Sequence, residues 1–461
     1  MPLPDRLSAL DSAFLDLETA QAPLHVGWTL KLEGPAPSVA ALRRHVDARL
    51  DGLPRFRRRV DGQQWVDDDG FDVARHVHGM TLAAPGGGGE LRALAGTLLS
   101  RPLDMNRPLW RLSRIDGLAG GGWAIVGQAH HALVDGIAAI QVALLLFDGV
   151  DAPPSTWTSR PAPSGARSAQ ANAGARATGA ARAAGALTAA LRRPAGPARE
   201  VRAAASALSR PAAPTSLDRS ATRRREVAFA DAPLEDLRAA GRRHGATIND
   251  ILLAASSLAL GRALKRRGER PQAVKVLVPV NTRTGEPGDL GNDISFITVE
   301  LPVRETDPLR VLRSVRDATK AAKAGGEARP LRALTQASDL LPGPGRRLVI
   351  RTAVRAAGFN AVVSNVPGPP EHLTLLGRRL TAMHPAVPFL HGHAVSIGAL
   401  SYAGRLQAGV YADAEVLPDA VELARDLEQA LDALRVGQRE PAVTPWGARA
   451  RARRRPQGAR R

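Results

Sequence analysis

The sequence predicts an α/β fold in which two mixed-sheet domains are joined by a long linker. Strand-like and helix-like stretches alternate from Leu10 to about Val150, and ordered patterns resume at Val227. Between them, residues 152–217 are dominated by Ala, Arg and Pro and hold few large apolar side chains. A stretch of that composition cannot bury a core of its own, so we expect it to be an interdomain linker.

The expected organisation therefore has four parts. Residues 1–151 form the first domain, residues 152–217 the linker, residues 218–440 the second domain and residues 441–461 a basic, disordered tail. With 461 residues, 44% of them hydrophobic, the chain can build two cores of ordinary composition.

The first domain shows clear strand and helix signals. Leu24–Leu32 has strand character and stops at the turn residues Glu33-Gly34-Pro35. Ser38 is a good N-cap for a helix whose apolar residues recur at helical spacing as far as Leu50. Trp123–Ala129 is almost wholly apolar, which is typical of a central strand.

The strongest helix signal lies in the second domain. Thr247 is an N-cap, Asp250 at the third helical position makes a variant of the capping box, and Gly268 supplies the stop. The other elements expected there are strands over Val274–Val280 and Ile294–Leu301, a hairpin of Ala394–Tyr402 with Arg405–Tyr411, and a helix over residues 418–436.

The net charge of +19 is concentrated in two segments that look poorly folded. Residues 441–461 hold seven Arg and no acidic residue, and residues 152–215 hold nine Arg and one Glu. Removing their +7 and +8 leaves +4 on the rest of the chain, which argues against a basic nucleic-acid-binding body. The two segments could attract anionic lipid head groups or simply be solvated, and both interpretations stay open.

Several classes of protein are disfavoured by what the sequence omits. It contains no cysteine, which excludes disulfides, thiolate metal sites and an acyl-cysteine intermediate. No run of about 18 apolar residues appears, so a membrane span is not expected. The first residues show no basic region followed by an apolar stretch, so a signal peptide is not expected either.

One motif carries chemistry: His130-His131-Ala132-Leu133-Val134-Asp135-Gly136, which follows the apolar strand. Acyl transfer from a thioester to an alcohol needs a base to take the hydroxyl proton, and the ordinary histidine pKa of about 6.5 suits that task. A His-x-x-x-Asp pair alone often arises by chance, and a lone histidine near a strand end is usually structural. The full string, placed after an apolar strand and before an apolar stretch that is expected to be a helix, is far more specific.

This motif resembles the active-site motif of the CoA-dependent acyltransferase superfamily, which includes chloramphenicol acetyltransferase and peptide-synthetase condensation domains. Other segments narrow the resemblance to the bacterial wax ester synthase/diacylglycerol acyltransferase family, over roughly residues 7–440 without the linker. These segments, in family order, are Leu7–Leu15, Pro23–Gly27, Pro102-Leu103-Asp104, Arg107–Trp110, Asn249-Asp250, Gly291-Asn292 with Ser295, and Ser364–Pro369. The departures are modest: Arg111 stands where an acidic residue is common, and the linker and tail are unusually Arg-rich.

The resemblance implies two chloramphenicol-acetyltransferase-like domains with an active-site tunnel between them. It makes His131 the general base and His130 its support. Asp135 would be a structural partner, pairing with an arginine that follows a strand of the second domain, for which Arg283 is the candidate. Gly136 would permit a close backbone approach that a side chain forbids.

Other polar residues have both a functional and a structural interpretation. Asn249 could hydrogen-bond a substrate carbonyl or the tetrahedral oxyanion, or it could serve with Asp250 at the start of a helix. Asn365 opens a segment rich in Pro and Gly that is expected to be a rigid turn shaping the tunnel. His391 and His393 have the spacing of a metal pair on a strand, but the sequence offers no third ligand beside them, so structural roles are favoured.

By this resemblance the protein is an acyl-CoA-dependent O-acyltransferase that moves a fatty acyl chain to diacylglycerol, to a long-chain alcohol, or to both. The implied partners are acyl-CoA, the acceptor and a membrane or lipid-droplet surface, with no cofactor, no metal and no specific nucleic acid. The expected location is cytoplasmic, at the inner membrane face or on lipid droplets. Two alternatives remain: an enzyme of the same superfamily acting on a polyketide, peptidyl or sugar hydroxyl, and a non-catalytic lipid-droplet protein.

Overall fold

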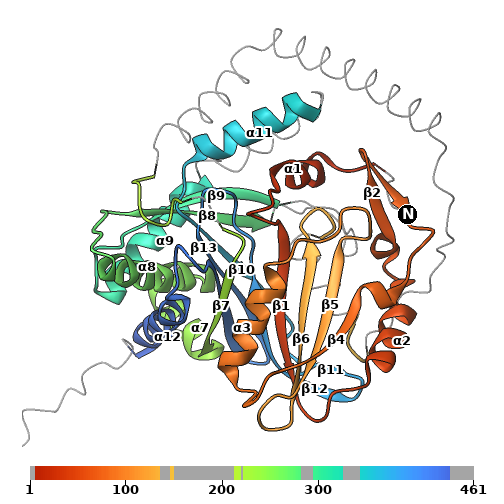
Figure 1. Ribbon diagram of the computed structural model, residues 1–461. Coiled ribbons are helices and arrows are strands. Elements are labelled where there is room, and N and C mark those ends of the chain that lie inside the picture. The colour runs from red at the N-terminus through yellow and green to blue at the C-terminus, as the bar shows by residue number, and fades with distance from the viewer. Residues whose placement is uncertain are drawn as a thin grey trace, which may run out of the picture.

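The computed structural model describes residues 6–134, 146–149, 212–219, 222–281, 294–324 and 343–436. The described residues form two six-stranded mixed sheets that stand side by side, each with its own helices (Figure 1). Most of the expected linker and the whole expected tail lie outside these residues, so the domain boundaries stay a prediction. Among the described residues, no helix is long and apolar enough to cross a membrane.

The first sheet has the strand order β11-β12-β1-β6-β5-β4. Its strands are β1 (His25–Leu32), β4 (Val77–Thr81), β5 (Trp110–Asp116), β6 (Trp123–His130), β11 (Thr374–Leu375) and β12 (Arg378–Ala386). Strand β1 is central and pairs antiparallel with β6 on one side and with β12 on the other. A late segment of the chain therefore completes the sheet that the early segment begins, which the sequence did not predict.

Helices and a small ribbon surround this sheet. They are α1 (Ala9–Leu17), α2 (Val39–Leu50), α3 (Gly88–Leu99), the 3-10 turns η1 (Pro54–Arg57) and η2 (Val73–Arg75), and the hairpin of β2 (Arg58–Asp61) with β3 (Gln64–Asp67). Helix α1 begins in a capping box, in which Ser8 and Asp11 each accept a hydrogen bond from the other's backbone N–H. Ser38 caps α2 as expected.

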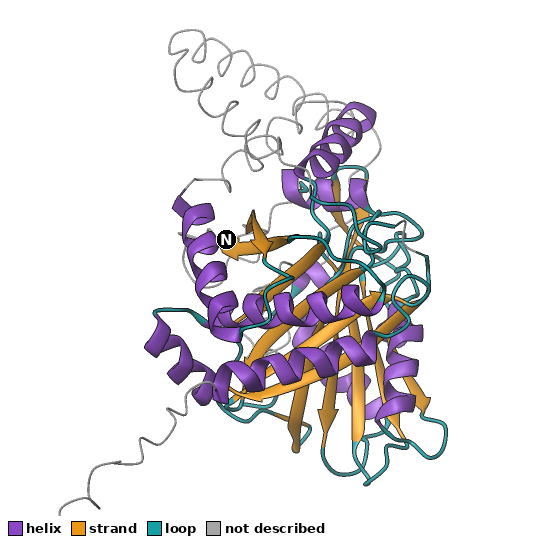
Figure 2. Cartoon of the chain, turned by 90° about the vertical axis from the view of Figure 1, so that its left-hand side faces the viewer, coloured by secondary structure: helices purple, strands orange, loops and turns teal. Residues whose placement is uncertain are grey.

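The second sheet has the order β7-β14-β13-β10-β8-β9. Its strands are β7 (Arg225–Pro233), β8 (Val274–Asn281), β9 (Ile294–Leu301), β10 (Ala361–Val366), β13 (Val395–Tyr402) and β14 (Arg405–Asp413). Its helices are α7 (Leu234–His244), α8 (Ile248–Arg266), α9 (Pro308–Ala324), α11 (Gly343–Ala357) and α12 (Ala420–Val436). Several of these helices lie across its strands in Figure 2.

The expected elements of the second half are confirmed. Thr247 and Asp250 form the capping box of α8. The β13–β14 hairpin turns at Ala403 and Gly404, which both have positive φ as a tight two-residue turn requires. Asn365 differs from expectation: it lies inside β10, paired in register with Ala399, and the turn begins only after Val366.

The two halves meet where α3 packs against β7 (Figure 1). Gly96 of α3 allows this approach, because a Cβ there would lie 2.4 Å from the carbonyl oxygen of Arg225. One hydrophobic cluster joins Leu98 and Leu99 of the first half to Phe389 and Tyr411 of the second. The histidine motif lies next to this junction, so both halves can influence it.

Candidate active site

The twin histidines lie at the end of the most buried strand of the first sheet. His130 is the last residue of β6, all eight residues of which are buried, and His131 begins the turn that follows. Backbone hydrogen bonds fix both residues: the N–H of His130 donates to the carbonyl of Leu109 at 2.9 Å, and that of His131 to the carbonyl of Leu24 at 2.8 Å. The motif is therefore held at a defined place before its side chains are considered.

His130 is buried, and both of its ring nitrogens are engaged. Its Nδ1 accepts the backbone N–H of Ala132 at 3.0 Å, so the ring proton is on Nε2. That Nε2 lies 2.6 Å from Oε2 of Glu18 and donates to it. With one nitrogen accepting and the other donating, His130 has no free nitrogen for a substrate.

Glu18 connects this histidine to the chain before β1. Its Oε2 also accepts the N–H of Leu24 at 3.1 Å. Burial alone would raise the pKa of Glu18, but the hydrogen bond and charge interaction with His130, together with the Leu24 N–H, lower it below its usual range. Glu18 is therefore ionised at neutral pH and pulls on the proton of the His130 ring.

His131 is only partly buried, unlike its neighbour. Its ring stacks on Phe14 of α1, with the two ring centroids 3.9 Å apart and the planes 14° from parallel. Desolvation is the main cause that lowers the pKa of His131 from 6.5 to about 4. A hydrogen bond with its own backbone raises this pKa, and the proximity of His130 lowers it further. The imidazole is therefore neutral at cellular pH, the state that a general base needs.

A third histidine, His25, lies beside the pair. It is the register partner of His130 across β1 and β6, and it is buried. Its Nε2 lies 3.0 Å from the carbonyl oxygen of Leu99 and donates to it, since a carbonyl can only accept. Burial lowers the pKa of His25 to about 4, so His25 is neutral at neutral pH and places no positive charge beside the histidine pair.

The remaining candidates are spread over the molecule. Three of them lie outside the described residues: Asp135, Gly136 and Arg283. The expected pairing of Asp135 with Arg283 therefore also lies outside the described residues. Asp250 is buried, and its Oδ2 accepts the N–H of Thr247 at 2.8 Å, which supports its structural interpretation.

Two amide candidates, Asn249 and Asn365, are partly buried, on the first turn of α8 and in β10 respectively. The described hydrogen bonds of the second sheet do not connect either of them to the histidines. Of the two late histidines, His391 is exposed, and His393 stacks on Phe359 with its Nε2 2.8 Å from the carbonyl of that residue.

Sequence reasoning missed Glu18, His25 and Phe14 as parts of the site. Phe14 and His25 fall within segments that carried the family resemblance, but nothing local in the sequence marks them as neighbours of His131. Glu18 falls between those segments and is 112 residues from its partner His130. The only local signal is that an acidic residue directly follows an apolar helix, where the helix dipole disfavours it and another reason for its presence is needed.

The paired mixed sheets, with a histidine pair at the end of an inner strand, form a fold that is also seen in solved structures. The same fold occurs in the first condensation domain of the calcium-dependent antibiotic synthetase, at a TM-score of 0.60 and 17% identity over 94% of this chain and 96% of that one. It also occurs in the wax ester synthase/diacylglycerol acyltransferase from Marinobacter aquaeolei VT8, at a TM-score of 0.66 and 24% identity over 94% and 99%.

Sequence comparison identifies the family. Residues 7–252 match the wax ester synthase/diacylglycerol acyltransferase catalytic domain, and residues 290–435 match the corresponding C-terminal domain. A probable diacylglycerol O-acyltransferase of Mycobacterium tuberculosis is 33% identical over 93% of this chain and 95% of its own length. The O-acyltransferase WSD of Acinetobacter baylyi is 28% identical over 92% and 95%. The chain belongs to the wax ester synthase/diacylglycerol acyltransferase family and is an acyltransferase.

Proposed function

We propose that the protein transfers a fatty acyl group from acyl-CoA to diacylglycerol, giving triacylglycerol, or to a long-chain alcohol, giving a wax ester. The observation that carries the proposal is the geometry of the pair: His131 stacks on Phe14 beside the buried His130–Glu18 pair. Desolvation lowers the pKa of His131, which supports a neutral imidazole. The names of the relatives from Mycobacterium and Acinetobacter support these substrates.

The proposed reaction proceeds in one active complex without an acyl-enzyme. His131 takes the proton of the acceptor hydroxyl while its oxygen attacks the thioester carbonyl. The tetrahedral oxyanion collapses, the carbon–sulfur bond breaks, and the proton held by His131 leaves with the CoA thiolate as CoA thiol. Atoms and charge balance with acyl-CoA and alcohol as the only reactants, so we propose no cofactor or metal.

The other candidates take supporting parts in this proposal. Asn249 donates its amide to the oxyanion, and Asn365 shapes the tunnel through which the substrates enter. Asp135 pairs with Arg283 to hold the motif turn, and Gly136 lets the backbone pass close to the substrate.

A panel of acceptors tests the proposal directly. Purified protein is incubated with labelled palmitoyl-CoA and, in separate reactions, with diacylglycerol, hexadecanol, a sugar alcohol and a hydroxyacyl pantetheine. We expect ester formation and equimolar CoA release with the first two acceptors. Ester with only the last two would favour the alternative within the superfamily, and neither ester nor CoA release with any acceptor would favour a non-catalytic protein.

The pKa of His131 predicts the pH dependence of the reaction. A general base must be neutral, so activity falls only as pH drops through the pKa of the free enzyme's base. We expect the acid limb of kcat/KM to lie near pH 4 and not near the ordinary histidine value of 6.5. The profile of log kcat/KM from pH 3.5 to 8 measures it, and half-maximal activity at pH 6.5 would contradict the assignment.

The same pKa values predict how stability changes with pH. His131 and His25 take up protons more readily when unfolded, because their folded pKa values are near 4. The free energy of unfolding should therefore be unaffected by these groups above pH 6.5 and should decrease as pH falls from 6.5 toward 4. The acid limb of activity must accordingly be measured in short assays.

We further propose that the enzyme reaches its lipid substrates as a peripheral protein on an anionic membrane or droplet surface, through α11. This helix contains no acidic residue, and its exposed residues include Arg351, Arg355 and Leu348, of which Leu348 is 68% exposed. Its opposite side packs on α1, where Nε of Arg346 lies 2.6 Å from Oδ2 of Asp16. A surface bound to α11 would therefore adjoin the helix that carries Phe14.

Charge reversal on α11 is expected to weaken membrane binding. Each basic residue near an anionic surface contributes about 1 kcal/mol, so the double variant Arg351→Glu and Arg355→Glu should bind at least about tenfold more weakly. Co-flotation with vesicles containing phosphatidylglycerol measures the partition. The same two changes on α9, Arg310→Glu and Arg313→Glu, are the control, and equal loss in both double variants would remove α11 from the proposal.

A further inference from the structure

The loop between α1 and β1 comprises residues 18–24. The last residue of this loop, Leu24, contacts the histidine pair, and the middle of the loop contacts the second half of the molecule. Leu24 donates its N–H to Glu18 and accepts the N–H of His131 with its carbonyl. Glu18 in turn holds His130. Whatever fixes this loop therefore fixes the backbone of one catalytic histidine and the ring of the other.

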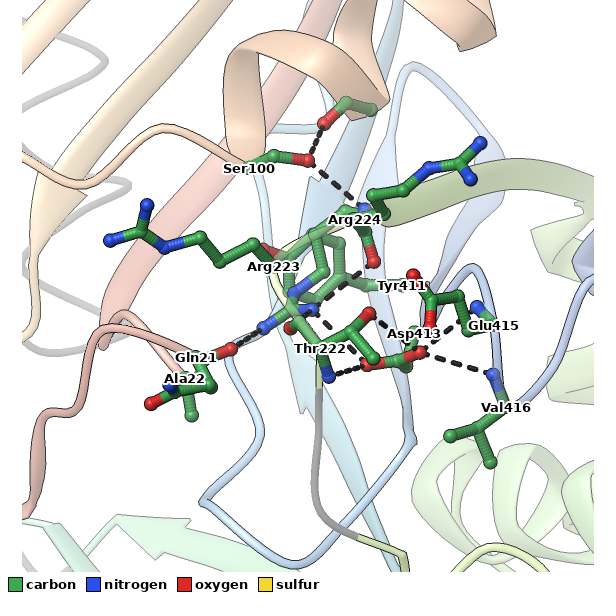
Figure 3. A network of polar contacts seen from close by, with 12 residues as sticks. Gln21, Ala22, Ser100, Thr222, Arg223, Arg224, Tyr411, Asp413, Glu415 and Val416 are labelled. Carbon is green, nitrogen blue, oxygen red and sulfur yellow. Dashed lines mark hydrogen bonds and ion pairs between the residues drawn. The ribbon is translucent and has the colours of Figure 1, made fainter.

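The middle of the loop is held by two arginines at the start of the second sheet, and Figure 3 shows the Gln21 carbonyl within this network. The carbonyl oxygen of Gln21 accepts a hydrogen bond from Nη2 of Arg225, the first residue of β7. Beside it, the carbonyl of Ala20 accepts from Nε of Arg223 at 3.2 Å. The two contacts span more than 200 positions of sequence.

Arg225 is itself held rigidly inside the protein. Its side chain is 1% exposed and lies 3.5 Å from the carboxylate of Asp413, which is fully buried. The guanidinium stands over the rings of Phe389 and Tyr411, at 4.7 and 5.7 Å from their centroids. Its backbone N–H donates to the Ser100 hydroxyl at 3.0 Å, which ties it to the end of α3 as well.

Asp413 is anchored as firmly as the arginine. Its Oδ1 accepts the N–H groups of Glu415 and Val416 at 3.0 and 3.1 Å, and both of its oxygens contact Thr222 (Figure 3). A charge with this many fixed partners does not relax when the loop moves. The pair of Arg225 and Asp413 is therefore a rigid support for the Gln21 carbonyl.

We propose that Arg225 is a positioning residue for acyl transfer, acting through the Gln21 carbonyl and the loop to set His130 and His131. The second half of the molecule thus orients the base that the first half supplies. This inference rests on the proposed function of the histidine pair. A planar guanidinium is required, because one nitrogen faces Asp413 while another reaches Gln21, and a lysine ammonium cannot bridge both at these positions.

The first experiment compares Arg225→Lys with Arg58→Lys in the full-length protein. Arg58 and Asp67 form a second buried ion pair, at 2.8 Å, within the β2–β3 hairpin. We expect kcat to fall on the order of 10²-fold in Arg225→Lys, with KM little changed, since small displacements of reacting groups have effects of that size. Arg58→Lys should lower the melting temperature similarly and leave kcat within about twofold. Equal kcat in the two variants overturns the proposal.

The second experiment uses surface arginines, which the fold tolerates. Arg223→Ala removes the exposed contact to Ala20, and Arg224→Ala removes a neighbouring exposed arginine that makes no described side-chain hydrogen bond to the loop. We expect Arg223→Ala to lower kcat about threefold, the scale of one hydrogen bond, and Arg224→Ala to leave it unchanged. If Arg223→Ala and Arg224→Ala have the same kcat, the loop does not position the histidines. This conclusion holds even if Arg225→Lys does not fold.

A spectroscopic readout separates failure of this inference from failure of the proposed function. The imidazole nitrogen signals of His130 report which nitrogen carries the proton, whether or not the protein makes any ester. In Arg225→Lys we expect the Nε2 and Nε2–H signals of His130 to shift as its hydrogen bond to Glu18 lengthens, while Nδ1 stays the acceptor of the Ala132 N–H. Unchanged His130 signals in a folded Arg225→Lys variant overturn the positioning role regardless of activity.

Discussion

Replacing His131 by alanine is expected to lower kcat on the order of 10²–10⁴-fold, the usual contribution of a general base. The loss should appear in kcat and not in KM, because the imidazole takes the proton in the transition state and does not bind acyl-CoA. Steady-state kinetics with labelled palmitoyl-CoA and the better acceptor of the panel measure it. The melting temperature is measured alongside, because the ring is desolvated and stacks on Phe14, so its removal also costs some stability.

The matched control is His391→Ala. His391 is exposed and lies in the second half, so its loss should leave both kcat and the melting temperature unchanged. If His131→Ala and wild type formed ester at the same rate, the assignment of His131 as the base would be wrong. If His131→Ala loses activity because it unfolds, the kcat of His131→Gln is measured instead, since glutamine keeps a polar group of similar size.

The second large effect is expected at Glu18. Glu18→Ala removes the acceptor of a 2.6 Å hydrogen bond and leaves the buried Nε2–H of His130 without its partner. Hydrogen bonds to charged groups contribute about 1.5–3 kcal/mol, so we expect kcat to fall on the order of 10²-fold, together with a lower melting temperature. Glu18→Gln keeps an acceptor oxygen without the charge and should fall between Glu18→Ala and wild type.

Glu33→Gln is the control for this carboxylate. Glu33 makes an exposed ion pair with Arg379 at the rim of the first sheet, and exposed pairs contribute little. Its loss should change neither kcat nor stability measurably. The role of Glu18 would be refuted by Glu18→Gln and Glu18→Ala variants that fold normally and turn over at the wild-type rate.

Local sequence signals predicted most of the single elements. The capping box of Thr247 with Asp250, the N-cap Ser38 and the hairpin at Ala403-Gly404 each depend on neighbours within a few residues, and each is present in the structure. The histidine motif was recognisable for the same reason, because its residues are consecutive. Asn365 was misplaced because Pro367 and Gly368 mark a turn without showing where the preceding strand ends.

Non-local contacts could not be predicted in this way. Nothing in the periodicity of Arg378–Ala386 shows that this strand pairs with β1 of the first sheet instead of with its own half. The partners of His130 and of the Gln21 carbonyl are likewise far away in the chain, and a single sequence contains no record of which distant residues touch. The expected pairing of Asp135 with Arg283 stays a prediction, since both lie outside the described residues.

The central claim is that His131 removes the acceptor's proton, and one comparison of acceptors tests it most directly. A thiol needs a base far less than an alcohol does, because an alkanethiol is more acidic than the matching alkanol by several orders of magnitude. Wild type and His131→Ala are therefore assayed with dodecanol and with dodecanethiol at pH 8. We predict that His131→Ala loses on the order of 10²–10⁴-fold with dodecanol but less than about tenfold with dodecanethiol. Equal losses with both acceptors would show that His131 does not act by taking the proton.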